Sequence, residues 1–334
     1  MTPARSTTTD DQAEGVPGER AEKPTEIPAG GWWQIVSRGL AEAKKDQVPL
    51  LGAGVAFYAF LALFPGIIAL VTIYGFFADP SVIAGQVQSL AALPEEVRQL
   101  IVDQVENRDR SALGWGAVIS VAVALFSASG GVSQLMLAIN AAYDEEESRN
   151  FVMQRAIALA VTVGAIVFLS LMLGIVAVLP AVLRGLFGDS PVLGFLLQIG
   201  SWLVLVVLVM AALAVLYRVA PQRDAPKVRW VSVGAAVATA LWLVGSIGFS
   251  LYVTFFGNYA ATYGVLAGIV ILLFWLWLTS YAVLLGAEIN AEAEQQTAAD
   301  TTRGTPKPAG TRDAVKADAG PGEDPRGERE RTEG

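Results

Sequence analysis

Long apolar stretches without charged side chains alternate with short polar segments through the middle of the chain. Asp, Glu, Lys and Arg are absent from residues 47–78, 111–143, 156–183, 190–217 and 230–287. A helix that rises 1.5 Å per residue needs roughly 20 apolar residues to cross a hydrocarbon core about 30 Å thick. Each of the first four stretches is long enough for one crossing. The fifth is long enough for two, with Gly257-Asn258-Tyr259 as the turn between them.

The pattern therefore predicts an all-α fold, a polytopic transmembrane helix bundle that forms one membrane domain over residues 31–293. Residues 1–30 and 294–334 carry almost no large apolar side chains, so they cannot bury enough surface to offset the entropy lost on ordering. We predict that both are disordered tails, with partner binding through the charged C-terminal end as the alternative. About six spans are expected, near residues 50–77, 113–136, 157–182, 193–217, 231–255 and 264–286.

Two further helices are predicted outside the spans. Residues 31–46 mix tryptophan and aliphatic side chains with lysine and arginine at helical spacing, which suits a short helix in the lipid headgroup layer. Pro94-Glu95-Glu96 is a favourable helix start, and the apolar side chains up to Val105 share one face. We expect this second, amphipathic helix to lie on the outer surface or cap the bundle. Lipid sensing by the first helix and gating by the second are the alternatives.

Composition narrows the classes of function. The chain has 54% hydrophobic and 16% charged residues, where soluble domains have about a quarter charged, and its mean hydropathy is +0.50. It has no cysteine and no histidine, which removes the disulfide bond, the thiolate nucleophile, the commonest metal ligand and the usual general base. The net charge of −8 argues against a nucleic-acid partner. We therefore expect no cofactor, no metal and no enzyme activity.

The distribution of lysine and arginine predicts the orientation. Residues 1–30 contain no apolar run that could serve as a signal peptide, so we expect the first span to direct insertion. Cations near the span ends number nine on one side and four on the other, which favours both termini in the cytoplasm. The nine are Arg38, Lys44, Lys45, Arg149, Arg155, Arg218, Arg223, Lys227 and Arg229, and the four are Arg98, Arg108, Arg110 and Arg184.

Polar and helix-breaking residues inside the spans are candidate functional features. Pro65 predicts a kink in span one, and the run from Ser127 to Gly131 predicts a break in span two. Such interruptions either line a transport path or allow tight helix packing. Glu288 and Asn290 close span six at the inner boundary, where Arg218 is the expected partner of the carboxylate. A structural ion pair and a substrate contact are both compatible with that position.

Several of these residues occur together in an order that resembles the YihY/BrkB family of bacterial inner-membrane proteins, once labelled ribonuclease BN. The resemblance covers about residues 35–293 and leaves the tails unmatched. It is carried by Ala56-Phe57-Tyr58, Phe64-Pro65, Asn140-Ala141-Ala142-Tyr143, Tyr217-Arg218-Val219-Ala220-Pro221, Ala240-Leu241-Trp242, Phe249-Ser250-Leu251-Tyr252, Tyr263-Gly264 and Leu285-Gly286-Ala287-Glu288-Ile289-Asn290.

The resemblance implies six spans and a role in the cell envelope, with transport of lipid or lipopolysaccharide among the suggestions. The ribonuclease label is not carried over, because this chain lacks the histidines that hold the metals of tRNA-processing nucleases. We expect a translocator of a lipid or other envelope component, with membrane lipids as partners and a homo-oligomer allowed. A non-transporting scaffold for envelope integrity is the alternative. The candidate substrate-path or structural residues are Tyr58, Pro65, Asn140, Tyr143, Tyr217, Arg218, Pro221, Tyr263, Gly264, Glu288 and Asn290.

Overall fold

A computed structural model describes residues 16–77, 115–188, 190–255 and 265–323, and within these ranges the chain is helical without a β-strand. The all-α prediction is therefore confirmed. The predicted amphipathic helix around residues 94–105 lies outside the described residues and stays a prediction. The elements are the 3-10 helix η1 (Pro24–Glu26) and the α-helices α1 (Ala29–Lys45), α2 (Val48–Phe77), α5 (Trp115–Ala142), α6 (Phe151–Phe187), α7 (Pro191–Val219), α8 (Val228–Phe255), α10 (Val265–Gln295) and α11 (Val315–Asp318).

Five of these helices, α5, α6, α7, α8 and α10, are each long and apolar enough to cross a membrane. A sixth span is reached when α1 and the start of α2 are taken together as one bent pair, with 66° between them. Gln47 makes this bend, because its φ of 53° places it in the left-handed region that ends a helix. The expected short helix over residues 31–46 is α1.

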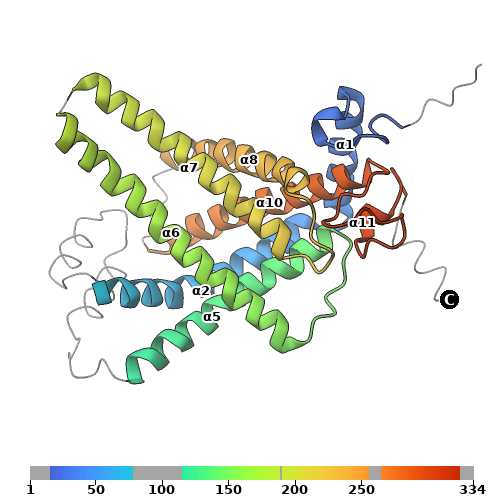
Figure 1. Ribbon diagram of the computed structural model, residues 1–334. Helices are drawn as coiled ribbons and strands as arrows, with labels where there is room; N and C mark the ends of the chain where they lie inside the picture. The colour runs from blue at the N-terminus through green and yellow to red at the C-terminus, as the bar shows by residue number, and fades with distance from the viewer. Residues whose placement is uncertain (1–15, 78–114, 189, 256–264, 324–334) are drawn as a thin grey trace, which may run out of the picture.

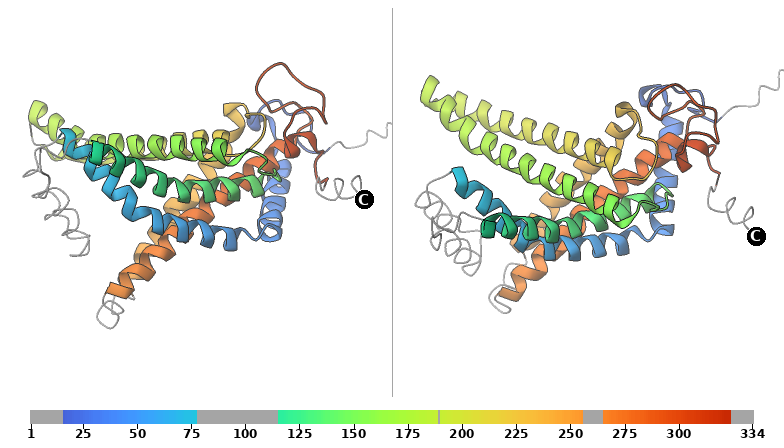
Figure 2. Two further views of the ribbon diagram at one scale, coloured as in Figure 1. Left: turned by 90° about the horizontal axis from the view of Figure 1, so that it is seen from below. Right: turned by 60° about the horizontal axis from the view of Figure 1, so that its bottom comes forward.

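The six long helices pack in a closed circuit. α2 packs against α5, α5 against α6, α6 against α7, α7 against α8 and α8 against α10, and α10 returns to α2. The pairs α2–α5, α6–α7 and α8–α10 converge at the end that carries α1 and α11, and they diverge towards the opposite end (Figures 1 and 2). We call the first the hub end and the second the splayed end.

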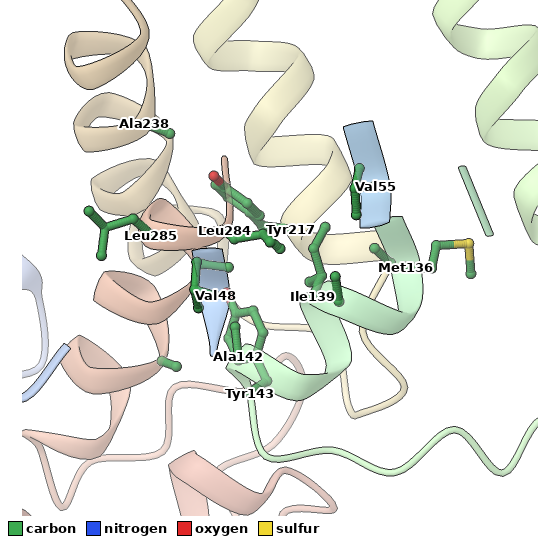
Figure 3. Close-up of a cluster of buried hydrophobic side chains, with 14 of the residues drawn as sticks. Val48, Val55, Met136, Ile139, Ala142, Tyr143, Tyr217, Ala238, Leu284 and Leu285 are labelled. Carbon is green, nitrogen blue, oxygen red and sulfur yellow. The ribbon is translucent and has the colours of Figure 1, made fainter. Parts of the chain in front are cut away.

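The main hydrophobic core lies towards the hub end. It joins side chains of all six long helices, among them Val48, Ile139, Tyr217 and Leu284, all nearly inaccessible to solvent (Figure 3). A second cluster packs α1 against α8 and α10 through Ile35, Trp230 and Ile289. Among the described residues, both cores lie at one end of the bundle, and the helices diverge at the other.

The α6–α7 hairpin is apolar and poorly covered. Between Pro191 and Leu216, no α7 side chain that the structure describes is buried. Trp202 is 57% exposed and Val207 63% exposed. A helix that exposes this much apolar surface is suited to hydrocarbon rather than water, because each Å² of apolar surface in water costs roughly 25 cal/mol. The arrangement therefore fits a lipid environment around this hairpin.

One expected interruption is absent from the structure. α5 runs unbroken from Trp115 to Ala142, so the break predicted at Ser127–Gly131 is wrong. α2 is one helix that contains Pro65, and the kink predicted there stays a prediction. Gly131 instead faces α2, where an added Cβ would lie 3.2 Å from the carbonyl oxygen of Tyr58. The small residues of this run thus serve close packing. An unbroken α5 also keeps the backbone hydrogen bonds of its interior, which matters most in an apolar medium.

Parts of both expected tails are folded. Residues 16–28 and 298–323 pack on the hub end: Ala298 N–H donates to the Glu19 carbonyl at 2.8 Å, and Thr297 Oγ1 donates to the Ala21 carbonyl at 2.6 Å. These segments are ordered by contacts with distant parts of the chain, both polar contacts and the burial of side chains such as Ile27 and Val315, so composition alone does not report their order. Residues 1–15 and 324–334 lie outside the described ranges.

The closest helix crossing generates a first prediction. An added Cβ on Gly234 of α8 would collide with the Gly286 carbonyl oxygen of α10, and one on Gly286 would lie 2.6 Å from the Gly234 carbonyl oxygen. Gly234→Ala should therefore lower the free energy of unfolding by about 1–3 kcal/mol, because the helices must move apart. Denaturant unfolding in mixed micelles, followed by circular dichroism, measures this.

Gly248→Ala is the matched control on the same helix, because nothing lies within 4 Å of an added Cβ there. It should leave stability unchanged or raise it by up to about 1 kcal/mol through helix propensity. Equal destabilisation by both substitutions would contradict the close crossing.

Candidate functional site

The last turns of α10 are polar in sequence but buried in the structure. Every residue from Leu284 to Thr297 is buried. α1, α8, α11 and the segment after α10 surround this part of the helix (Figure 1). Buried polar groups are costly unless they are paired, so we examined where each side chain finds its partners. We use the term polar hub for the set Asn290, Glu292, Glu294, Gln295 and Gln296 together with their cationic partners Arg38, Arg223 and Lys316.

Glu292 is bound by two cations from opposite ends of the chain. Arg38 Nε on α1 donates to its Oε2 at 2.7 Å, and Lys316 Nζ on α11 donates to its Oε1 at 2.8 Å. Lys316 also pairs with Asp144, at 3.1 Å from Oδ2. Burial alone would lower the pKa of Lys316, but the carboxylates of Glu292 and Asp144 outweigh it and hold that pKa above its ordinary value. Lys316 is therefore a permanent cation in this environment.

Glu294 forms a second, fully buried ion pair. Arg223 Nη2 lies 2.5 Å from Glu294 Oε2, and neither side chain is accessible to solvent. The guanidinium carbon of Arg223 also stands 5.0 Å from the ring centroid of Tyr143, a cation–π contact. Burial opposes the charge of Arg223, but Glu294 outweighs it and raises the arginine pKa. This pair joins the loop after α7 to the end of α10.

Asn140 connects two loops at the hub end. Its Nδ2 donates to Glu147 Oε2 at 2.9 Å, and its Oδ1 accepts the Gln222 backbone N–H at 2.8 Å. Arg149 pairs with Glu147 and donates from Nη2 to the Ala220 carbonyl at 2.9 Å. Burial would raise the pKa of Glu147, but the hydrogen bond and charge of Arg149 lower it overall. The loop after α5 is thereby fixed to the loop after α7.

Asn290 and Tyr217 bond to the backbone of neighbouring helices. Asn290 Oδ1 accepts the Gly234 N–H at 2.6 Å, and the Tyr217 hydroxyl donates to the Val283 carbonyl at 2.6 Å. Both contacts secure α10 against α7 and α8 close to the glycine crossing. These two predicted residues therefore hold helices together in this structure.

Glu288 differs from the other acids of α10. It is fully buried, and neither of its carboxylate oxygens has a hydrogen-bond partner among the described residues. The charged groups that act on it are Asp46, Lys316, Glu292 and Asp144. Arg218 does not contact it, so the expected Glu288–Arg218 pair is wrong. Arg218 is the penultimate residue of α7, and its half-exposed side chain does not reach the end of α10.

The structure thus brings together Asn140, Tyr143, Tyr217, Glu288 and Asn290 at the hub end. Pro221 is buried in the loop after α7. Tyr58 and Pro65 lie apart on α2: Tyr58 is exposed and makes an edge-on contact with Phe57 at 5.6 Å between ring centroids. Tyr263 and Gly264 lie outside the described residues.

Sequence reasoning missed the partners that complete the hub, namely Arg38, Asp144, Glu147, Arg149, Gln222, Arg223, Glu292, Glu294 and Lys316. One signal in the sequence does indicate part of this arrangement. Glu288, Glu292 and Gln295 recur at spacings of four and three in an alanine-rich run that continues span six, so they share a helix face. This pattern predicts a polar face extending past residue 286, but it does not identify the partners.

These features define a polytopic helical membrane protein with a polar, ion-paired end. The model of the family described as Virulence factor BrkB matches residues 40–311, and the chain belongs to that family. The family resemblance inferred from the sequence motifs is confirmed. No solved structure matches the chain.

Relatives support the assignment. The chain is similar to a Bacillus subtilis (strain 168) protein named "Putative ribonuclease-like protein YfkH", at 30% identity over 246 residues, 72% of this chain and 87% of the relative. It is similar to UPF0761 membrane protein IL2447 of Idiomarina loihiensis, at 30% identity over 203 residues, 60% of this chain and 68% of that protein. A shorter match to UPF0761 membrane protein YihY of Salmonella arizonae has 48% identity over 75 residues, 22% of this chain and 26% of that protein.

The buried ion pair gives a second prediction. Arg223→Met should lower the free energy of unfolding by about 3–5 kcal/mol, because Glu294 would remain charged and buried without its cation. Adding Glu294→Gln should recover most of the loss, since the stranded charge is then removed. Denaturant unfolding of the two variants tests this. Lys307→Met, which breaks an exposed pair with Asp224, should not change stability measurably; a similar loss there would contradict the special role of burial.

The lowered pKa of Glu147 gives a third prediction. Because its folded-state pKa lies below the ordinary 4.5, the Glu147–Arg149 pair stabilises the fold fully above that pH. The contribution is lost as the pH falls through the folded-state pKa. Unfolding midpoints measured from about pH 3 to about pH 7 should therefore fall more steeply on acidification for the natural protein than for Glu147→Gln. Parallel profiles would contradict the assignment.

Proposed function

We propose that the protein translocates an amphipathic envelope lipid across the inner membrane, with both termini in the cytoplasm. The observation that carries the proposal is the α6–α7 hairpin, which belongs to the closed circuit of helices yet leaves α7 without a buried side chain from Pro191 to Leu216 among those described. Apolar side chains suit acyl chains and disfavour ions or soluble polar solutes. The substrate class that fits this surface is therefore lipid.

Arg155 supplies a group that would recognise a lipid phosphate. It lies on α6, four residues after the helix begins, with its guanidinium carbon 4.4 Å from the ring centroid of Phe126 on α5. Its Nε is buried and has no hydrogen-bond partner within the described ranges. Gly130 lies beside Nη1, and a Cβ added there would be 3.9 Å from it, in van der Waals contact. A guanidinium with unused donors is well matched to phosphate oxygens.

The hub end has the opposite character. Ion pairs and glycine contacts hold α7, α8 and α10 together there, so this end would stay closed while the splayed end changes its spacing. Gating by movement of one hairpin against a fixed end is an established way to alternate access. In this scheme the headgroup passes Arg155 while the acyl chains remain against the hairpin.

Reconstitution into liposomes that contain fluorescent phospholipid analogues tests the proposal. Chemical quenching of the outer leaflet measures the rate of exchange between leaflets, and we expect a faster rate with protein than in protein-free liposomes. If the rates with protein equal those of protein-free liposomes for anionic, zwitterionic and glycolipid analogues alike, the proposal is overturned. That result would favour the alternative, a scaffold for envelope integrity.

Arg155→Leu provides a sharper test of phosphate recognition. It should lower the exchange rate of an anionic phospholipid analogue about tenfold, since a hydrogen bond to a charged group contributes about 1.5–3 kcal/mol. Arg155→Lys should retain part of the rate. Arg229→Leu, at the exposed start of α8, removes an equal charge and should leave the rate unchanged. Equal losses in the Arg155→Leu and Arg229→Leu variants would point to net charge rather than recognition.

A further inference from the structure

We propose that the acids around the end of α10 form a binding site for a primary ammonium group, which the chain's own Lys316 occupies in this structure. We call the carboxylates of Glu42, Asp46, Asp144, Glu288 and Glu292 the acidic cluster. They come from α1, the α1–α2 bend, the end of α5, and α10. This inference does not depend on lipid translocation.

Contacts of Lys316 define the site. Its Nζ lies 2.8 Å from Glu292 Oε1 and 3.1 Å from Asp144 Oδ2, and its side chain is 3% exposed. The charge of Glu42 also acts on it. An ammonium group offers three donors and no acceptor, so convergent carboxylates are the chemistry that selects it. The site thus already holds one primary ammonium group in a buried position.

Glu288 provides an independent observation that the site has binding capacity left. It lies one helical turn before Glu292 on the same face of α10, and both of its oxygens are buried and unpartnered among the described residues. Buried carboxylates normally accept hydrogen bonds, because burial without them is costly. Lys316 therefore leaves the acceptor oxygens of Glu288 unsatisfied among the described residues.

The same acids are not arranged for a metal ion, since the described residues hold no group of three acids able to bind one. An ammonium group can be bound by carboxylates that lie farther apart than metal ligands do, because each of its hydrogens can bond to a separate carboxylate.

The segment that delivers Lys316 has little helical structure of its own. α11 has only four residues, too few to be stable as an isolated helix. It is held from outside by polar contacts: Val315 N–H donates to Glu145 Oε1 at 2.8 Å, and Arg312 Nη2 donates to the Ala298 carbonyl at 2.7 Å. A free ammonium compound would compete directly with this tethered one. The two sources of such a group are a soluble amine and the ethanolamine headgroup of a phospholipid.

Chemical complementation tests the site in the full chain. Lys316→Ala removes a propylammonium-sized group, so n-propylammonium is the matching probe and n-propanol its uncharged counterpart. We expect the substitution to lower the melting temperature in detergent by about 5 °C or more. It should also expose the Arg312 peptide bond, now protected by burial, to trypsin. Millimolar n-propylammonium should restore both properties by at least half, and n-propanol should restore neither.

Lys307→Ala, in the same segment but in an exposed pair, is the control and should show neither effect. If n-propylammonium rescues nothing, or if n-propanol rescues equally well, Lys316 is a structural ion pair and the proposal fails.

Glu288→Gln separates binding from folding. In the Lys316→Ala background it should weaken n-propylammonium rescue by about tenfold, because an amide cannot ionise beside the probe's cation as the carboxyl group can. With Lys316 present, the same substitution should leave the segment protected from trypsin. If the n-propylammonium concentration that gives half-rescue is unchanged, Glu288 does not belong to the site and the proposal is overturned.

The source of the ammonium group is identified in nanodiscs of the Lys316→Ala variant. Protection in phosphatidylethanolamine but not in phosphatidylcholine discs assigns the site to the lipid headgroup. Protection only by added n-propylammonium assigns it to a soluble amine. Absence of protection in both experiments overturns the proposal.

Discussion

The burial of a charged helix end is the constraint on which the rest of this structure depends. α10 continues past its apolar part into a stretch that carries Glu288, Glu292 and Glu294, and all three are inside the protein. Unpaired, they would cost more than a fold of ordinary stability could supply. Each paired acid recruits a cation from a different part of the chain: Arg38 from α1, Arg223 from the loop after α7, and Lys316 from α11. The elements that surround α10 are therefore positioned by charge as well as by apolar packing.

The glycine crossing makes this arrangement compatible with a membrane protein. Gly234 and Gly286 let the backbones of α8 and α10 touch, which brings Asn290 within reach of the Gly234 N–H. Helices in lipid gain little from apolar contact with one another, so close backbone approach and interhelical hydrogen bonds carry much of the association. The splayed end has no comparable contacts among the described residues. The contacts that fix the described helices to one another are therefore concentrated at the hub end.

Sequence patterns predicted the spans because charge exclusion from hydrocarbon is a local rule, readable from residues 156–183 as easily as from any other stretch. The hub could not be predicted in this way, because Arg38 and Glu292 are 254 positions apart and nothing local pairs them. The composition of residues 298–323 suggested disorder. Their order in fact depends on distant partners such as Asp144, and no property of the segment itself reveals these partners. Gly130 and Gly131 were ambiguous for a similar reason: a glycine pair is typical both of a break and of close packing, and only the neighbouring α2 decides. Glu288 was identified as a candidate, but its expected partner Arg218 was wrong, because proximity to the same membrane boundary does not place two side chains in contact.

The meeting of the two chain ends has a topological consequence. Residues 17–21 hydrogen-bond to residues 296–298, so the segments before the first long helix and after the last one lie on one side of the bundle. A chain that leaves a side of a bilayer and returns to it has crossed an even number of times. Among the described residues, five apolar helices alone would give an odd number, and counting the bent α1–α2 pair as a sixth span gives an even one. The contact between the two ends therefore agrees with the six spans that the charge-free stretches predict.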